Sequence, residues 1–174
     1  MITVLPTSEL YVDSFHRCLD SVARERRFLA FLEAPPVGAL REFIRAIVSS
    51  GAIQFLALDG DTVVGWCDVL SKDLEGFTHV GTLGMGVASS HRRRRIGERL
   101  VTAALERSRA AGLERVELEV FRSNGPAIGL YEKVGFTHEG DKRGARKLDG
   151  AYDDVVLMAL ALSANDPGVR PLAG

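Results

Sequence analysis

Apolar residues recur along this chain at two spacings, and each spacing predicts one kind of element. Apolar positions three and four residues apart are typical of one face of a helix, and glycine or proline at the ends of such a stretch favours a start or a stop. The four expected helices run from Thr7 or Ser8 to Arg27, from about Val37 to Ser50, from Ile96 to about Ala111, and from Ser123 or Asn124 to Gly135.

Shorter runs that are rich in β-branched residues, or that alternate apolar with polar side chains, predict strands. Arg115–Val120 alternates most clearly, and Asp59-Gly60-Asp61 is a strong signal for a hairpin turn between two such runs. The seven expected strands are Ile2–Leu5, Ile53–Leu58, Thr62–Leu70, about Thr78–Val87, Arg115–Val120, Thr137–Lys147 and Ala151–Leu162.

The order of these elements is β-α-α-β-β-β-α-β-α-β-β, which predicts a mixed sheet with helices on both faces, in the α+β or α/β class. We expect residues 1–162 to form a single domain. The last segment, 163–174, contains two prolines and is interpreted as a C-terminal tail.

The composition is that of an ordinary globular protein without a strong overall field. Of 174 residues, 46% are hydrophobic and 26% charged, and the net charge is −1, which disfavours general binding to nucleic acid. Cys18 and Cys67 show no metal-ligand or redox spacing, so we expect no metal and a reducing, cytoplasmic setting. No apolar run is long enough to cross a bilayer, and Met1–Val4 is not a signal peptide, so no membrane association is expected.

The stretch Thr82–Gly97 combines a predicted strand, a polar turn, four consecutive arginines (Arg92–Arg95) and the start of a helix. The first N–H groups of a helix lack partners within it, and its N-terminus carries partial positive charge. A diphosphate is the ligand that such a turn suits best. A solvated basic turn is an equally weighted alternative.

Three segments resemble the GNAT superfamily of acyl-CoA-dependent N-acyltransferases. They are the strand and arginine turn Leu83–Val87 and Arg92–Gly97, the segment from Ser123-Asn124 through Leu130–Phe136, and the ending Leu148–Met158. The element order agrees as well, so the resemblance covers roughly residues 1–162. It implies a three-layer α/β arrangement, in which a mixed, mostly antiparallel central sheet of about six to seven strands has helices on both faces.

One residue of the arginine turn departs from the family's usual pattern, which is Arg or Gln, two residues, Gly, one residue, then Gly or Ala. Arg92 and Gly97 fit, but Arg95 stands where the first glycine is expected. If φ is negative there, arginine is accommodated and adds a charged donor. If φ is positive, arginine is strained and acyl-CoA affinity is in doubt. A proline that is common just after the strand is also replaced, by Ala88-Ser89.

The resemblance implies acetyl-CoA as cosubstrate. Main-chain N–H groups of about Arg93–Glu98 would hold its diphosphate. The pantetheine arm would lie as a false strand beside Met85 and Val87 and bond their backbone groups, and Gly84 and Gly86 would allow a bulge and a close approach there. A strand N–H near Met85 would stabilise the oxyanion. The residues expected at the coenzyme are Met85, Gly86, Val87, Arg92, Arg93, Arg94, Arg95, Ile96, Gly97, Glu98 and Asn124, of which Asn124 would bind pantetheine, cap its own helix, or do both.

Tyr131 is the expected catalytic residue. The resemblance implies that it lies near the sulfur and protonates the departing thiolate. The alternative is a core aromatic, because Ala127, Leu130, Tyr131 and Val134 fall at helical spacing.

The general base stays unassigned. The strand Thr78–Val87 contains no glutamate, which leaves His79, Asp68 or a water relay as candidates, with Glu117 and Glu119 on the following strand. An edge histidine and an outward-facing aspartate are the structural alternatives.

The acceptor pocket is expected between the loop Arg24–Pro36 and the hairpin Asp141–Asp154. Phe28, Phe31 and Leu32 would give it an apolar wall. The aspartates of the hairpin (Asp149, Asp153, Asp154) would attract an amine, whereas its basic residues (Lys142, Arg143, Arg146, Lys147) would suit a carboxylate. An amino acid, a small amine and a protein N-terminus all remain open as acceptors.

The sequence thus predicts an N-acetyltransferase that transfers the acetyl group of acetyl-CoA directly to a primary amine, with Tyr131 as general acid. The alternatives are an acyl-CoA-binding GNAT fold without transfer activity and a basic-patch module that binds anions or nucleic acid. The net charge of −1 and the lack of a second basic stripe argue against nucleic acid. A homodimer is common in the family and compatible with this chain.

Overall fold

The computed structural model describes residues 1–162 and contains one seven-stranded sheet in the order β1-β2-β3-β4-β5-β7-β6. The expected tail, 163–174, lies outside the described residues. The strands are β1 (Ile2–Pro6), β2 (Ile53–Asp59), β3 (Thr62–Ser71), β4 (Val80–Val87), β5 (Arg115–Phe121), β6 (Thr137–Leu148) and β7 (Ala151–Ala161). The helices are α1 (Val12–Ala23), α2 (Val37–Ser50), α3 (Ile96–Ala110) and α4 (Gly125–Lys133), with 3₁₀ turns at Glu9–Tyr11 and Ser89–His91.

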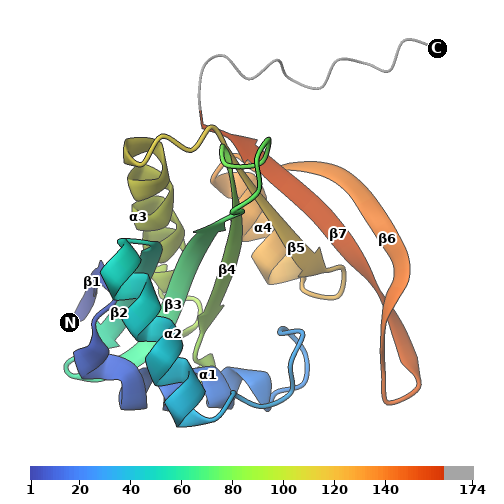
Figure 1. The fold of residues 1–174 in the computed structure, drawn as a ribbon. Helices are drawn as coiled ribbons and strands as arrows, with labels where there is room; N and C mark the ends of the chain where they lie inside the picture. Colours follow the sequence, from blue (N-terminus) through green and yellow to red (C-terminus); the bar gives the residue numbers. More distant parts are fainter. Residues whose placement is uncertain (163–174) are drawn as a thin grey trace.

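The helices cover both faces of the sheet, as Figure 1 shows, so the expected three-layer arrangement is confirmed. Successive side chains of a strand point to opposite faces, and neighbouring buried residues therefore belong to different cores. In β3, Trp66 packs with α1 and α2, whereas Cys67 packs with α3 and α4. No helix among residues 1–162 is both long and apolar enough to cross a membrane.

The predicted elements are present, with shifted ends. The first helix is shorter than predicted: Ser8 caps a 3₁₀ turn, α1 begins only at Val12, and it ends at Ala23, before the charged run. Gly51, with φ +68°, ends α2 as expected. The strand β4 starts at Val80, two residues later than predicted.

The sheet contains a single parallel pair among its described strands, and that pair is short. β4 and β5 are paired only from Val80 with Arg115 to Thr82 with Glu117. Beyond that point β4 stays paired with β3 as far as Val87, and β5 stays paired with β7 as far as Phe121. The two strands therefore separate, and the sheet is split between them in its middle.

Gly84 and Gly86 leave room for side chains of the neighbouring strand. The ladder between β3 and β4 runs without a register shift, so the expected bulge at these glycines is wrong. Instead Gly84 lies opposite Asp68 and Gly86 opposite Trp66. A Cβ atom on Gly86 would lie 2.2 Å from Cη2 of Trp66, and the indole occupies that space.

The substitution Gly86→Ala is expected to lower the free energy of unfolding by about 1–3 kcal/mol, because Trp66 is buried against Phe15 and cannot move aside without strain. Chemical denaturation measures the change. The matched control is Gly129→Ala in α4, where a Cβ atom would meet nothing within 4 Å and helix propensity favours alanine by up to about 1 kcal/mol. Equal stability of the two variants would contradict this packing account.

Candidate functional site

Two cavities adjoin at β4: one lies along the split in the sheet, and the other lies on the face that α1 and α2 cover. We call the first, of about 730 Å³, the β4 cleft; it lies along the split and is bounded by β4, the arginine turn, β5 and α4. The second, of about 760 Å³, is the α1–α2 cavity, which lies beneath the segment between α1 and α2. Leu29, Gly84 and Met85 line both cavities. The two cavities are therefore adjacent where β4 leaves β5.

The expected coenzyme residues gather around the β4 cleft. All of them line it except Arg94, whose side chain is exposed on the outer side of the turn. The backbone groups of successive β4 residues point alternately toward β3 and away from it. The N–H of Ala88 donates to the carbonyl of Val64, so every second residue before it, Gly86 and Gly84, also exchanges hydrogen bonds with β3. Met85 and Val87 therefore direct their backbone groups into the split, where β5 no longer pairs with them.

The N-terminus of α3 opens into one end of the β4 cleft. Within residues 1–162, the backbone N–H groups from Arg93 to Glu98 have no protein acceptor, and the first bond of the helix is from Arg99 to the carbonyl of Arg95. Unpaired N–H groups and the positive end of the helix dipole point to the same place. This end of the cleft is therefore suited to an anion.

The open question about Arg95 is decided in favour of a positive φ. Arg95 caps α3 with φ +60°, and Arg93 also has φ +60°. This conformation costs a residue with a side chain about 1–2 kcal/mol. The strain lies at a turn that lines the cleft, which is where functional sites commonly store it.

Arg92 joins the turn to the segment between α1 and α2. Its guanidinium makes two hydrogen bonds to Glu25, of 2.7 and 2.5 Å, and its Nε donates to the carbonyl of Val87 at 2.9 Å. It also stacks over the ring of Phe28, 4.7 Å from the centroid. The side chain of Arg92 is thus engaged within the protein, and it positions the turn relative to β4.

Asn124 caps α4 with its side chain. Its Oδ1 accepts from the N–H of Ala127 at 3.3 Å, which confirms the capping role. The amide nitrogen of the same side chain makes no hydrogen bond within residues 1–162, and Asn124 also lines the β4 cleft.

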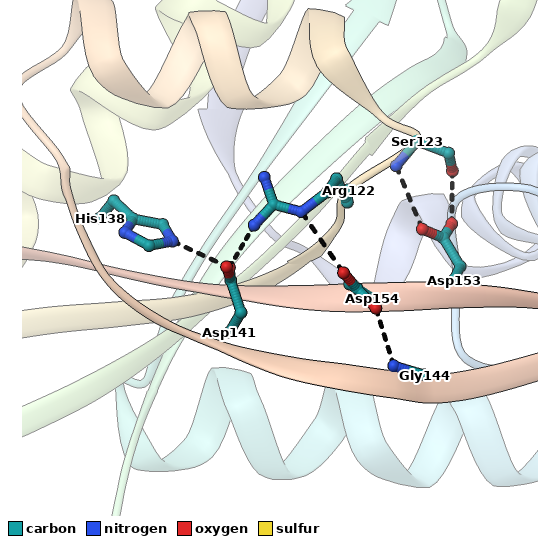
Figure 2. A network of polar contacts seen from close by, with 7 residues as sticks. All are labelled: Arg122, Ser123, His138, Asp141, Gly144, Asp153 and Asp154. Carbon is teal, nitrogen blue, oxygen red and sulfur yellow. Dashed lines mark hydrogen bonds and ion pairs between the residues drawn. The ribbon is translucent and has the colours of Figure 1, made fainter.

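A polar network holds the start of α4 against the β6–β7 hairpin (Figure 2). Ser123 donates its N–H and its hydroxyl to Asp153, and Arg122 forms ion pairs with Asp141 and Asp154. Asp154 also accepts from the N–H of Gly144 at 2.7 Å. The network fixes the residues next to Asn124, and it also occupies the carboxylates of the hairpin.

Tyr131 belongs to the core and to the cleft at once. It is 6% exposed, its ring packs against Phe136 at a centroid distance of 5.7 Å, and it lines the β4 cleft. The described part of the chain gives its hydroxyl no hydrogen-bond partner. Burial raises the pKa of the Tyr131 phenol, so the side chain is neutral and carries its proton at physiological pH.

Asp68 is the less exposed of the two acidic residues that line the α1–α2 cavity; the other is Glu33. Its Oδ1 would lie 3.0 Å from a Cβ atom on Gly84, so the carboxylate lies directly over β4 where the two cavities meet. Burial raises its pKa to about 7, and a hydrogen bond from Gln54 Nε2 at 3.5 Å partly offsets that rise. A carboxyl with this pKa can accept and release a proton near neutral pH.

The other candidate bases lie elsewhere or are engaged. His79 is exposed, precedes β4 and lines neither cavity. Glu117 pairs with Lys72 at 2.5 Å, and Glu119, which lines the β4 cleft, pairs with Lys142. Among these four side chains, Asp68 is the one that lines the α1–α2 cavity.

The expected acceptor walls are present in part. Phe31 lines the α1–α2 cavity and Phe28 lines the β4 cleft, but Leu32 lines neither. The hairpin reaches the α1–α2 segment through Asp149, which accepts twice from Arg26 at 2.8 and 2.9 Å. The hairpin therefore contacts the α1–α2 segment next to the site, and its acidic residues line neither cavity.

Sequence reasoning missed three residues of this site. Gln54 is 3% exposed, accepts from the hydroxyl of Thr7 at 2.9 Å and orients Asp68; its signal was a lone amide within an apolar strand. Glu25 holds Arg92, and Glu33 lines the rim of the α1–α2 cavity. Glu25 lies in a charged run that looks like ordinary surface, and Glu33 is a single charge at the end of an apolar stretch.

Comparisons with known proteins give a matching family and relatives of known activity. The family model described as Acetyltransferase (GNAT) family matches residues 9–136. The chain is 33% identical over 111 residues to the L-amino acid N-acetyltransferase AaaT of Escherichia coli (strain K12), covering 63% of this chain and 68% of that protein. It is 38% identical over 81 residues to mycothiol acetyltransferase of Corynebacterium glutamicum, covering 45% of this chain and only 26% of that protein.

Solved structures share the fold at lower identity. A putative acetyltransferase, yncA, from Salmonella typhimurium with its cofactor acetyl-CoA matches with a TM-score of 0.88 at 15% identity, covering 99% of each chain. A phosphinothricin acetyltransferase from Sinorhizobium meliloti in complex with AcCoA matches with a TM-score of 0.87 at 16% identity, covering 98% of this chain and 96% of that one.

The substitution Arg95→Gly is expected to raise the free energy of unfolding by about 1 kcal/mol, because glycine adopts φ +60° without strain. Thermal and chemical denaturation measure the gain. Arg94→Gly is the matched control: Arg94 is not among the residues with positive φ, so glycine there only increases the entropy of the unfolded chain and lowers stability. A loss of stability in both variants would show that φ at Arg95 is not a source of strain.

Proposed function

Because the chain belongs to the GNAT family of acetyltransferases, we propose that it transfers the acetyl group of acetyl-CoA directly to a primary amine. One observation carries the proposal: a cleft with free backbone N–H groups at one end meets a second cavity containing a carboxyl of pKa about 7. The first is suited to a nucleotide diphosphate with an extended arm, and the second to an amine.

Acetyl-CoA would bind in the β4 cleft. Its diphosphate would accept hydrogen bonds from the N–H groups between Arg93 and Glu98, with the side chains of Arg93 and Arg95 adding charge. The pantetheine arm would run along β4 as a false strand and use the backbone groups of Met85 and the N–H of Val87. The carbonyl of Val87 already accepts one hydrogen bond from Nε of Arg92, which leaves it one lone pair for the arm. Asn124 would bind the arm with its amide nitrogen.

The acceptor would enter through the α1–α2 cavity as an ammonium ion. At physiological pH an alkyl ammonium of pKa about 10.4 is almost fully protonated, and its deprotonation costs roughly 4 kcal/mol. Asp68 in its carboxylate form would take this proton, directly or through a water molecule. The nitrogen lone pair then attacks the thioester carbonyl carbon at Met85, where a strand N–H stabilises the oxyanion.

Collapse of the tetrahedral intermediate breaks the C–S bond and yields the amide and the CoA thiolate. Tyr131 would donate its proton to the thiolate, and the phenolate would be reprotonated by the proton that the new amide nitrogen loses. The proton on Asp68 returns to solvent. The balance is one ammonium and one thioester converted into one amide, one thiol and one released proton.

The relatives leave the acceptor open. The name of one relative specifies L-amino acids, and that of another, from Salmonella typhimurium, specifies ribosomal protein bS18 alanine. For this chain we propose the common chemistry, a primary amine. Both cysteines are free and buried, which suits the reducing cytoplasm that we propose as its location.

The substitution Tyr131→Phe tests transfer and the acid together. Wild type is expected to release CoA thiol from acetyl-CoA when a suitable amine is present, and the variant is expected to lose about 10²–10⁴-fold in kcat. Because the lost hydroxyl is not a binding group for the diphosphate, acetyl-CoA should still raise the melting temperature of the variant. Tyr152→Phe, at an exposed tyrosine of β7, is the matched control. An unchanged kcat in Tyr131→Phe would exclude the acid role.

The substitution Asp68→Asn tests the base through the pH profile. Since only the carboxylate accepts a proton, kcat/KM of wild type should rise with pH through about 7, the pKa of Asp68. Asparagine should abolish this inflection and lower the rate about 10²–10⁴-fold, leaving only the rise from ionisation of the amine itself at higher pH. Asp61→Asn, in the exposed turn between β2 and β3, is the control. A profile of Asp68→Asn that keeps the inflection near pH 7 would assign the base to another group.

A further inference from the structure

We infer that the acceptor of this enzyme is a primary amine on an apolar, preferably aromatic, body without a carboxylate next to the amino group. The inference rests on the proposed function and narrows it to a substrate class. It comes from the lining of the α1–α2 cavity and from the positions of the charged groups around it.

The lining of the α1–α2 cavity is apolar except at three side chains. The polar ones are Glu33, Gln54 and Asp68, and none of the residues that line it within the described part of the chain is Lys, Arg or His. Its volume of about 760 Å³ is within the range of cavities that enclose small organic ligands. The cavity therefore offers acceptors and negative charge to an ammonium group, and nothing cationic to a carboxylate.

The basic side chains near the cavity have partners of their own: Nε2 of His16 donates to the carbonyl of Pro35, and two arginines are paired with carboxylates. Arg24 donates to Asp20 at 2.7 Å and lies 3.5 Å from Glu33, while Arg41 of α2 pairs with Asp13 at 2.8 Å. Arg27 lines the β4 cleft instead, where its guanidinium stacks on Phe28. A carboxylate within the α1–α2 cavity would thus be desolvated without a counter-ion and would face Asp68. That combination is strongly unfavourable.

The aromatic side chains give the cavity its second preference. Phe15 and Trp66 are buried and packed together at its floor, with ring centroids 5.6 Å apart. Phe31 and Phe43, which line the same cavity, are 44% and 39% exposed. An apolar ligand body would cover these exposed rings, and each Å² of apolar surface removed from water contributes about 25 cal/mol.

The experiment compares three amines that share one aromatic body. They are 2-phenylethylamine, L-phenylalaninamide, in which the carboxylate is replaced by a neutral amide, and L-phenylalanine. Ethylamine serves as the amine without an apolar body. The measurements are kcat/KM for CoA release from acetyl-CoA and, independently of turnover, binding of each amine to the CoA complex by calorimetry.

We expect kcat/KM and binding affinity to be at least about 100-fold higher for 2-phenylethylamine and L-phenylalaninamide than for L-phenylalanine. Both quantities should also be at least about 10-fold higher for these two amines than for ethylamine. The variant Ala39→Arg adds a cation at an exposed lining position of α2 and should raise the ratio of L-phenylalanine to 2-phenylethylamine by at least about 10-fold. Ala46→Arg, on the same helix but outside the cavity, should leave that ratio unchanged.

The outcomes separate the inference from the proposed function. If L-phenylalanine is bound and acetylated as well as the two amines that lack a carboxylate, the inference is overturned while transfer stands. Selective binding of 2-phenylethylamine without CoA release from acetyl-CoA would support the cavity's preference and overturn transfer. Equal affinities for ethylamine and 2-phenylethylamine would exclude a preference of the cavity for an apolar body.

Discussion

The site depends on the point where the β4–β5 ladder stops. Backbone N–H and C=O groups inside a protein are costly when unpaired, so a sheet that separates in its middle needs water or a ligand to complete it. Here β4 is held by β3 and β5 by β7, and the two lose contact after Thr82 and Glu117. An extended polar chain is the ligand that best completes such an edge, because it can repeat the strand's own hydrogen-bond pattern.

The same split connects two surfaces that the sheet would otherwise separate. On the face of α3 and α4 lie the free N–H groups of a helix N-terminus, Asn124 and Tyr131; on the face of α1 and α2 lies Asp68. Gly84 allows the Asp68 carboxylate to approach β4 closely. A thioester bound from one face and an amine bound from the other would therefore meet at Gly84 and Met85. The ion pair of Arg92 with Glu25 ties the segment above the acceptor side to the turn on the coenzyme side.

Much of the fold could be predicted because its signals are local. Turn residues such as Asp59-Gly60-Asp61, the alternation in Arg115–Val120 and the cap at Asn124 act within a few residues, and the structure has these elements where they were expected. The site was less predictable because its properties depend on contacts between distant segments. Asp68 could not be preferred over His79 until the α1–α2 segment was seen to enclose it, and the φ of Arg95 is set by the geometry of the turn. Gly84 and Gly86 suggested a bulge, but their partners are Asp68 and Trp66 across the ladder.

The central claim is that the free N–H groups at the start of α3 bind the diphosphate of acetyl-CoA while the arm completes the edge of β4. Amide chemical shifts of the ¹⁵N-labelled protein during titration with acetyl-CoA test this residue by residue. The account predicts large, saturable shifts for Arg93–Glu98, for Met85 and for Val87, with much smaller ones for Gly84 and Gly86, whose backbone groups pair with β3. Saturable binding that leaves the amides of Arg93–Glu98 unchanged would contradict it.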